Sequence, residues 1–388
     1  MEPVNVIGAG MTKFGVHDDS FVSLAEEASF KAMRDSQTIE QRFDYLVVGS
    51  HNPDEFVNRG HLSTLLSDRL GLVPAGATRV ETGPSSGSSA FETAFALIAS
   101  GHSDLVLVVG VEKMSEVDRA TASRIISKMM SYENEARYGA TPPALAAMVA
   151  HRYMHDYELT RNELSLIPVK AHRNGAKNPL AHFQNEITID AVGKSQMVAT
   201  PLTLFDCCPI SDGAASVVLA SDRIVNTLGV SDQAVRVLGI GHGTDYHAVQ
   251  HRLSLTSFGA TIAAAEKAFS MAKVEREDVD VCELHDAFSI LELVNMEDIG
   301  LAERGRAKEL VKEGLTEVDG ELPVNTTGGL KARGHPTGAT GVAQIHDIYT
   351  QLVHRAPKGL QVNSPTIGLT QNIGGFGNNM VVGLFSAP

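Results

Sequence analysis

The sequence of 388 residues lacks tryptophan and contains only three cysteines, Cys207, Cys208 and Cys282. A small, odd number of cysteines gives neither a disulfide framework nor a zinc-binding pattern. No apolar run approaches the roughly 20 residues that a membrane-spanning helix needs, and the N-terminus shows no secretory signal. We therefore expect a cytoplasmic protein without a membrane span.

Basic residues are also scarce, because 32 Lys and Arg stand against 46 Asp and Glu, which gives a formal net charge of −14. Binding to nucleic acid needs clustered Lys and Arg, so we expect no nucleic-acid partner. An anionic small ligand would have to be held locally, by backbone N–H groups and a few cations. The 43% hydrophobic and 20% charged residues are typical of a globular protein.

No clear set of metal ligands is present. His242, Asp245, His247 and His251 form a loose cluster in which two histidines would share a helix face. We treat a metal site there as the minor interpretation and predict none.

Short apolar runs alternate with helical patterns in the first half of the chain. Residues 45–49 and 105–110 are continuous Val- and Leu-rich runs, typical of strands buried on both faces of a parallel sheet. Between them, a Ser- and Gly-rich turn at residues 83–89 leads into an apolar helical segment that Gly101 can cap. This order of strand, helix and strand predicts a layered α/β fold.

The second half repeats this order, which indicates a duplicated fold. A second glycine-rich turn, at residues 334–338, opens a helix as the turn at residues 83–89 does. Residues 115–214 break the rhythm. We therefore divide the chain into an N-terminal half (1–114 and 215–230), an inserted loop domain (115–214) and a C-terminal half (231–388).

Three glycine-flanked or strand-end loops of the second half contain the residue types of a catalytic site. His335 directly precedes a predicted helix, whose N-terminus offers unpaired N–H groups and a positive dipole end that suit an oxyanion or an activated nucleophile. Residues 372–377, Asn-Ile-Gly-Gly-Phe-Gly, form a tight loop whose backbone can approach a ligand closely. His285 follows a strand, the usual place of function in open α/β sheets.

Together with other motifs, these loops resemble those of the thiolase superfamily, most closely its archaeal and sterol-carrier-protein-type members. The resemblance covers nearly the whole chain, and the motifs follow the family's order. They are Ser86-Gly87-Ser88-Ser89-Ala90, Gly110-Val111-Glu112-Lys113-Met114-Ser115, Asn178-Pro179-Leu180-Ala181-His182-Phe183, residues 206–215 starting at Asp206-Cys207-Cys208, His285-Asp286-Ala287-Phe288, and the two glycine loops.

The resemblance implies a duplicated five-layer αβαβα thiolase fold with an inserted loop domain. It implies a coenzyme A thioester as substrate, no permanently bound cofactor, and a Claisen condensation or thiolytic cleavage of the acetyl-CoA acyltransferase type. By position, His335 matches the histidine that activates the family's cysteine nucleophile, and His285 matches an oxyanion-hole histidine. The backbone around Gly374 and Gly375 would add an N–H donor to the same site.

Two further residues beside His335 are candidates for binding the substrate's CoA part. Lys331 and Arg333 would contact the CoA phosphates, and the alternative is that they belong to a solvated turn. The resemblance also implies protein partners. We expect a homodimer or homotetramer, and a small zinc-ribbon/OB-fold protein as a further partner.

The sequence departs from the family where the nucleophile is expected. When Ser86-Gly87 is laid on the family motif, Pro84 stands at the position of the cysteine nucleophile, and Ala287 stands where the sterol-carrier branch has a second cysteine. Three alternatives remain open. In the first, Ser85 or its neighbour Ser86 is a weaker acyl carrier. In the second, the protein makes or breaks carbon–carbon bonds without an acyl-enzyme, as a retro-aldolase-type lyase does. In the third, it is a non-catalytic scaffold subunit that binds acyl-CoA.

Overall fold

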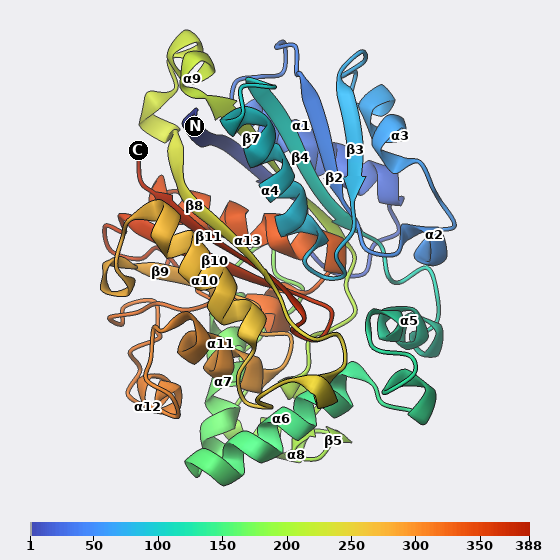
Figure 1. The fold of residues 1–388 in the computed structure, drawn as a ribbon, viewed down its shortest axis with the longest axis vertical. Helices are drawn as coiled ribbons and strands as arrows, with labels where there is room; N and C mark the ends of the chain where they lie inside the picture. Colours follow the sequence, from blue (N-terminus) through green and yellow to red (C-terminus); the bar gives the residue numbers. More distant parts are fainter. Residues whose placement is uncertain (1) are drawn as a thin grey trace.

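One mixed sheet of nine strands runs through the computed structural model, which describes residues 2–388 (Figure 1). The strand order is β3-β2-β4-β7-β1-β8-β11-β10-β9. The strands are β1 (Val4–Met11), β2 (Tyr45–Gly49), β3 (Gly76–Val80), β4 (Leu105–Glu112), β7 (Gly213–Ser221), β8 (Val235–Thr244), β9 (Val281–Leu284), β10 (Ile367–Gly374) and β11 (Asn379–Ser386).

The sheet confirms the predicted duplication, because its two halves have the same topology. In the first half β2 is parallel to β4, β4 is antiparallel to β7, and β7 is antiparallel to β1. In the second half β9, β10, β11 and β8 repeat those relations in that order. The outer strand β3 pairs with β2 in the first half, and its counterpart in the second half is only a single parallel bridge between Val324 and Cys282 of β9. The halves meet edge to edge through two residue pairs between β1 and β8, Asn5–Arg236 and Val6–Val235.

Helices cover the sheet in the expected layers. The helix α1 (Phe21–Asp35) packs on β1 and β7, and α10 (Gly259–Ala272) packs on β8 and β11. Between the half-sheets, α4 (Ser86–Ala99) and α13 (Thr337–Leu352) pack against each other in the middle of the molecule (Figure 1). Three clusters of buried apolar side chains fill the outer N-terminal, central and outer C-terminal interfaces, which gives the five layers.

Residues 115–214 contribute only the start of β7 to the large sheet and otherwise form a helical extension (green in Figure 1). The boundaries that we assign to the three domains stay a prediction, and Met1 lies outside the described residues. The extension consists of α5 (Arg119–Ile126), α6 (Pro142–Tyr157), α7 (Arg161–Gly175), α8 (Ile189–Lys194) and a hairpin of β5 (Met197–Ala199) and β6 (Leu202–Thr203). The remaining helices are α2 (Pro53–Phe56), α3 (Leu62–Arg69), α9 (Asp222–Leu228), α11 (Ser289–Ile299) and α12 (Ala307–Lys312).

Across residues 2–388, no helix combines the length and the apolar character that a bilayer span requires.

Glycines let the two central helices approach at their N-termini. A Cβ on Gly87 of α4 would lie 2.7 Å from the Gly338 carbonyl oxygen and 3.0 Å from the Val342 backbone nitrogen, both in α13. Backbone atoms in a packed layer cannot shift cheaply. This close crossing brings the Ser/Gly-rich turn of the first half beside the glycine-rich turn of the second half.

We therefore predict that Gly87→Ala lowers the free energy of unfolding by about 2 kcal/mol or more, as overpacking of a close-packed layer does. Gly193→Ala is the matched control, because Gly193 is also helical and a Cβ there would meet no atom within 4 Å. That control should leave stability within about 1 kcal/mol or raise it. Urea denaturation midpoints measure both, and equal midpoints for the two variants would contradict the tight crossing.

Candidate active site

His285 and His335 face each other across one cavity of about 360 Å³. Their ring centroids are 4.9 Å apart and the rings are nearly perpendicular. The sequence separates these histidines by fifty residues, and the duplicated fold brings their loops together at the N-terminus of α13. The remaining wall is mainly apolar and includes Pro84, Cys208, Ala287, Phe288, Ile373 and Phe376.

His335 presents an unprotonated ring nitrogen to this cavity. Its Nδ1 lies 2.7 Å from the Thr340 hydroxyl oxygen, and that hydroxyl donates to the Pro336 carbonyl at 2.9 Å. A hydroxyl has one proton, so Thr340 accepts from His335, and Nδ1 is the protonated nitrogen. Burial, together with Arg333, lowers the pKa of His335 to about 3. The ring is therefore neutral, and its Nε2 is a hydrogen-bond acceptor and a base.

His285 has the opposite tautomer. The Ser88 hydroxyl donates to the Asn372 side-chain oxygen at 3.1 Å, so the Asn372 amide group faces His285 and donates to its Nδ1 at 2.9 Å. Since Nδ1 accepts, the proton of the neutral ring is on Nε2. Burial, with His335 as the next cause, lowers the pKa of His285 well below its usual value. Its backbone is also fixed, because its N–H donates to the Gln371 side chain at 3.1 Å.

The cavity thus has a base and a donor side by side, both uncharged. A neutral imidazole N–H can donate to a developing oxyanion, and the free nitrogen of a neutral imidazole can accept a proton. Both rings are almost fully buried, so the site provides these groups in a medium where hydrogen bonds to developing charge are strong.

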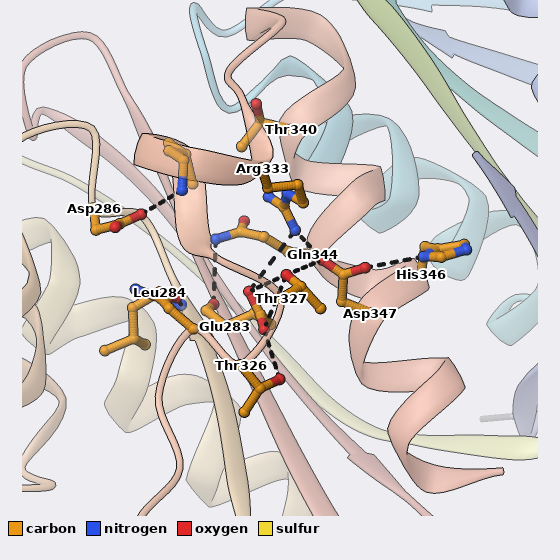
Figure 2. Close-up of polar contacts among 12 residues, drawn as sticks. Glu283, Leu284, Asp286, Thr326, Thr327, Arg333, Thr340, Gln344, His346 and Asp347 are labelled. Carbon is orange, nitrogen blue, oxygen red and sulfur yellow. Dashed lines mark hydrogen bonds and ion pairs between the residues drawn. The ribbon is translucent and has the colours of Figure 1, made fainter. Parts of the chain in front are cut away.

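Buried ion pairs hold the two histidine loops together (Figure 2). Arg333, two residues before His335, pairs with Asp347 of α13 and lies 3.8 Å from Glu283, two residues before His285. A second pair joins the same loops, because the Lys331 ammonium lies 3.5 Å from the Asp286 carboxylate. Burial, followed by Asp347, raises the pKa of Glu283.

These contacts correct the expectation that Lys331 and Arg333 bind CoA phosphates. Both side chains are completely buried and paired with carboxylates, and neither lines the cavity. Their charges are needed to neutralise the acidic groups of the strand-end loop and of α13. The alternative of a solvated turn is also wrong for them.

The N-terminus of α13 is occupied by a side chain of the first half. The Glu112 carboxylate accepts from the Gly338 backbone N–H at 3.1 Å and the Thr337 hydroxyl at 3.1 Å. It also accepts from the His51 N–H at 2.7 Å. Burial nevertheless raises the pKa of Glu112 to about 7. The N-terminus of α13 was expected to bind an oxyanion of the substrate, but in the structure it binds the Glu112 side chain of the protein itself.

Ser85 lies beside the cavity and is not part of its wall. It is completely buried, and its hydroxyl lies 2.8 Å from the Thr82 carbonyl and 3.0 Å from the Asn379 side-chain oxygen. The neighbouring Pro84 is on the wall instead. A serine whose proton is engaged in this way lacks a base in contact with it, which nucleophilic catalysis requires.

Of the two glycines of the last loop that were expected at the site, Gly374 and Gly375, only one lines the cavity. Gly375 lines the cavity, whereas Gly374 is the last residue of β10 and does not. Gly375 has a φ of +58° and Gly83 has a φ of +66°, and a Cβ on Gly83 would lie 3.0 Å from the Gly375 nitrogen. Only glycine allows both the conformation and the approach.

Cys207 and Cys208 also line the cavity, which the sequence analysis did not foresee. Cys208 donates its backbone N–H to the Ala287 carbonyl at 2.9 Å, so this segment lies against the His285 loop. Burial raises the pKa of both thiols to about 12, and thiols are poor nucleophiles when protonated. A sequence signal was available, because both cysteines belong to a motif of the family.

The loose histidine cluster does not form a ligand set. His242 contacts Glu92 and Asn379, and His247 contacts Asn378. Within residues 2–388 no three His, Cys, Asp or Glu side chains are arranged so that they could hold a metal ion.

Comparison with known proteins places the chain among thiolases. Residues 4–223 match the family model "Thiolase, N-terminal domain" and residues 241–387 match "Thiolase C-terminal domain-like". An "Acetyl-CoA acetyltransferase" of Methanothermobacter thermautotrophicus is 41% identical over the full length of both chains. "Sterol carrier protein 2" of Bos taurus is 32% identical over 98% of this chain and 72% of its own. The predicted resemblance to archaeal and sterol-carrier-type members is confirmed.

Solved structures show the same fold. The structure entitled "Ltp2-ChsH2(DUF35) aldolase" superposes with a TM-score of 0.86 at 23% identity, covering 100% of this chain and 98% of that one. Human mitochondrial 3-ketoacyl-CoA thiolase superposes with a TM-score of 0.73 at 17% identity, covering 100% and 99%.

The opposite tautomers of the two histidines are directly testable. We expect the imidazole ¹⁵N spectrum to show His335 protonated on Nδ1 and His285 protonated on Nε2, with neither ring gaining a proton as the pH falls from 8 to about 5. The reason is that burial disfavours the charged form of both. The His155 side chain is 81% exposed and lies outside the cavity, so its ring provides a reference signal in the same spectrum. Titration of either buried ring above pH 6 would contradict this assignment.

Proposed function

Because the chain belongs to the thiolase family, we propose that it acts on acyl-CoA thioesters, making or breaking the carbon–carbon bond next to the thioester carbonyl without a covalent acyl-enzyme. The observation that supports this proposal is the pair of neutral histidines, one a base and one a donor, in a cavity where Pro84 offers no nucleophile.

In the cleavage direction the reaction is a retro-aldol step on a β-hydroxyacyl-CoA. Nε2 of His335 removes the hydroxyl proton, the oxygen electron pair forms a carbonyl, and the bond between the α and β carbons breaks. Its electrons pass into the thioester, whose enolate oxygen accepts from Nε2–H of His285. The His335 imidazolium then returns its proton to the α carbon, which releases an acyl-CoA and a carbonyl compound. Condensation is the reverse.

Enolate chemistry fits the site because it needs only a base and an oxyanion donor. Each typically contributes a factor of about 10² to 10⁴ in rate. Transfer of an acyl group through a covalent intermediate needs a nucleophile as well, and Ser85 is held by Thr82 and Asn379.

Relatives support the substrate class and the fold supports the reaction type. The relatives at about 40% identity are named acetyl-CoA acetyltransferases, which favours a CoA thioester. A protein of the same fold is described as an aldolase, so this architecture is compatible with aldol chemistry. A Claisen-type acyltransferase is the second candidate, and it is favoured by those acetyltransferase names.

Partners and location are part of the proposal. We expect a homodimer or homotetramer, supported by the free edge of the outer strand β3, since unpaired sheet edges are natural pairing sites. We also expect a small zinc-ribbon/OB-fold partner, because the aldolase structure of this fold contains a DUF35 protein. A cytoplasmic location stays a prediction.

Hydrogen exchange at the α carbon tests the enolate step without a second substrate. In D₂O, the wild-type protein should exchange the methyl protons of acetyl-CoA, because His335 removes a proton and His285 stabilises the enolate. His335→Ala should slow exchange by about 10²-fold or more, and His155→Ala, at an exposed site, should not. NMR or mass spectrometry of the recovered acetyl-CoA measures the rate. Binding of acetyl-CoA without any exchange would instead support a scaffold subunit.

The missing nucleophile can be restored at one position. Pro84→Cys should acquire an acetyl adduct from acetoacetyl-CoA, because residue 84 lies on the cavity wall with His335. Ser85→Cys is the matched control and should remain unmodified, because residue 85 is buried outside the cavity. Intact mass after incubation detects the adduct. An acetyl adduct on Ser85 of the wild-type protein would overturn the proposal of a non-covalent reaction.

A further inference from the structure

Two loops of the helical extension lie against the segment that leads into His335. Both loops, residues 178–183 and residues 206–215, belong to the family motifs, but the steps of the proposed reaction use no side chain from either of them. The first loop is tied to this segment through its backbone, because the His182 N–H donates to the Arg333 carbonyl at 3.0 Å. The extension is therefore in direct contact with the chain that carries the base.

One side chain of the second loop, Ser211, joins the base to the first loop. Its hydroxyl oxygen accepts from the His335 backbone N–H at 3.2 Å and lies 2.9 Å from Nδ1 of His182. Ser211 is completely buried and does not line the cavity that holds the two histidine rings. It therefore acts on the backbone of the base without touching a ligand in the cavity.

The direction of these hydrogen bonds follows from the single proton of the Ser211 hydroxyl. Apart from His182, the acceptor in reach is the Pro209 carbonyl at 3.4 Å, which is long for a bond whose usual length is about 2.7–2.8 Å. Burial lowers the pKa of His182, which favours the neutral ring that can accept a proton. The chain of donors therefore runs from the His335 N–H to Ser211 and from Ser211 to Nδ1 of His182.

The residue directly before the base, Gly334, passes close to both side chains. Its φ is +110°, and a Cβ there would lie 2.9 Å from the Ser211 hydroxyl oxygen and 3.3 Å from the His182 Cβ. Glycine is the residue that combines this conformation with so close an approach. A displacement of Ser211 or His182 would therefore change the packing around the backbone at the point where the chain enters His335.

We propose that Ser211 and His182 are positioning residues for the base. Ser211 holds the His335 backbone, and His182 orients the Ser211 hydroxyl so that its oxygen is free to accept. Thr340 selects the tautomer of the base, whereas these two residues fix its place in the cavity. Misplacement of a reacting group by about 1 Å can cost about 10²-fold in rate. This inference rests on the proposed function, because it takes His335 as the base.

The kinetics of proton exchange in acetyl-CoA test this role. Ser211→Ala should lower kcat for exchange about tenfold or more and leave KM within about threefold, because Ser211 does not line the cavity. Ser216→Ala is the matched control, because Ser216 is also completely buried and its hydroxyl donates to a backbone carbonyl, that of Val108 at 2.8 Å. This variant should keep the wild-type kcat.

Two substitutions of His182 separate positioning from packing. The side-chain oxygen of asparagine takes the place of Nδ1 and accepts the Ser211 proton, whereas leucine has no acceptor. His182→Asn should therefore keep most of the wild-type kcat, and His182→Leu should lose as much as Ser211→Ala does. The imidazole ¹⁵N signals of His335 should shift in Ser211→Ala and in His182→Leu, but not in His182→Asn or Ser216→Ala.

The ¹⁵N spectra distinguish failure of this inference from failure of the proposed function. If the wild type exchanges acetyl-CoA protons and Ser211→Ala has the same kcat, the positioning role is wrong. Unchanged His335 signals in Ser211→Ala also overturn it, whatever the kinetics. If Ser211→Ala does not fold, equal kcat values for His182→Asn and His182→Leu overturn it instead. Absence of exchange in the wild type overturns the proposed function, and the His335 signals of the variants then still decide whether Ser211 and His182 position this ring.

Discussion

The candidate site depends on one buried cluster of charges, formed by Arg333, Asp347 and Glu283. Arg333 belongs to the segment that leads into His335, Glu283 belongs to the strand that leads into His285, and Asp347 anchors both to α13. Removing one member of a buried ion pair typically costs about 3–5 kcal/mol. Loss of one member of the cluster would therefore disturb the relative position of the two imidazoles.

Burial is the main cause that keeps the two histidines neutral, and the same cluster adds to it. Buried cations near an imidazole disfavour its protonated form, and Arg333 acts in this way on both His285 and His335. Neutrality alone does not define the chemistry, because a neutral imidazole has two tautomers. Thr340 selects one tautomer for His335, and Asn372 selects the other for His285. A charge cluster and two hydrogen bonds thus make a base and a donor from two identical side chains.

Most of the fold was predictable because its signals are local. The apolar runs at 45–49 and 105–110 are strands, with the second extending to Glu112, and the turn before α4 is where its Ser/Gly pattern indicates. The edge strand β3 was not predicted, since its residues are only partly buried and lack an apolar run. The helices of residues 115–214 were also missed, because their packing against the second half is not visible in a local pattern.

A motif can specify which residues lie together, but the role of each residue depends on its environment, which no motif shows. His285, His335 and the last glycine loop meet as the motifs imply. A lysine or arginine beside a catalytic histidine, however, has the same sequence signature whether it binds a phosphate or a buried carboxylate. Only the positions of Asp286, Asp347 and Glu283 decide between these, and no local pattern shows that these three carboxylates lie beside Lys331 and Arg333.

The position of Pro84 gives this arrangement its chemical meaning. An apparatus for covalent acyl transfer places its base against a nucleophile, whereas here the wall includes Pro84, and burial raises the pKa of its two thiols, Cys207 and Cys208. Keeping two imidazoles and five charged side chains (Glu283, Asp286, Lys331, Arg333 and Asp347) out of water costs folding free energy. Of these groups, only the two imidazoles lie on the wall of the cavity, where a bound ligand would contact both of them. In the proposed reaction, the enolate of the thioester needs only this base and this donor from the protein.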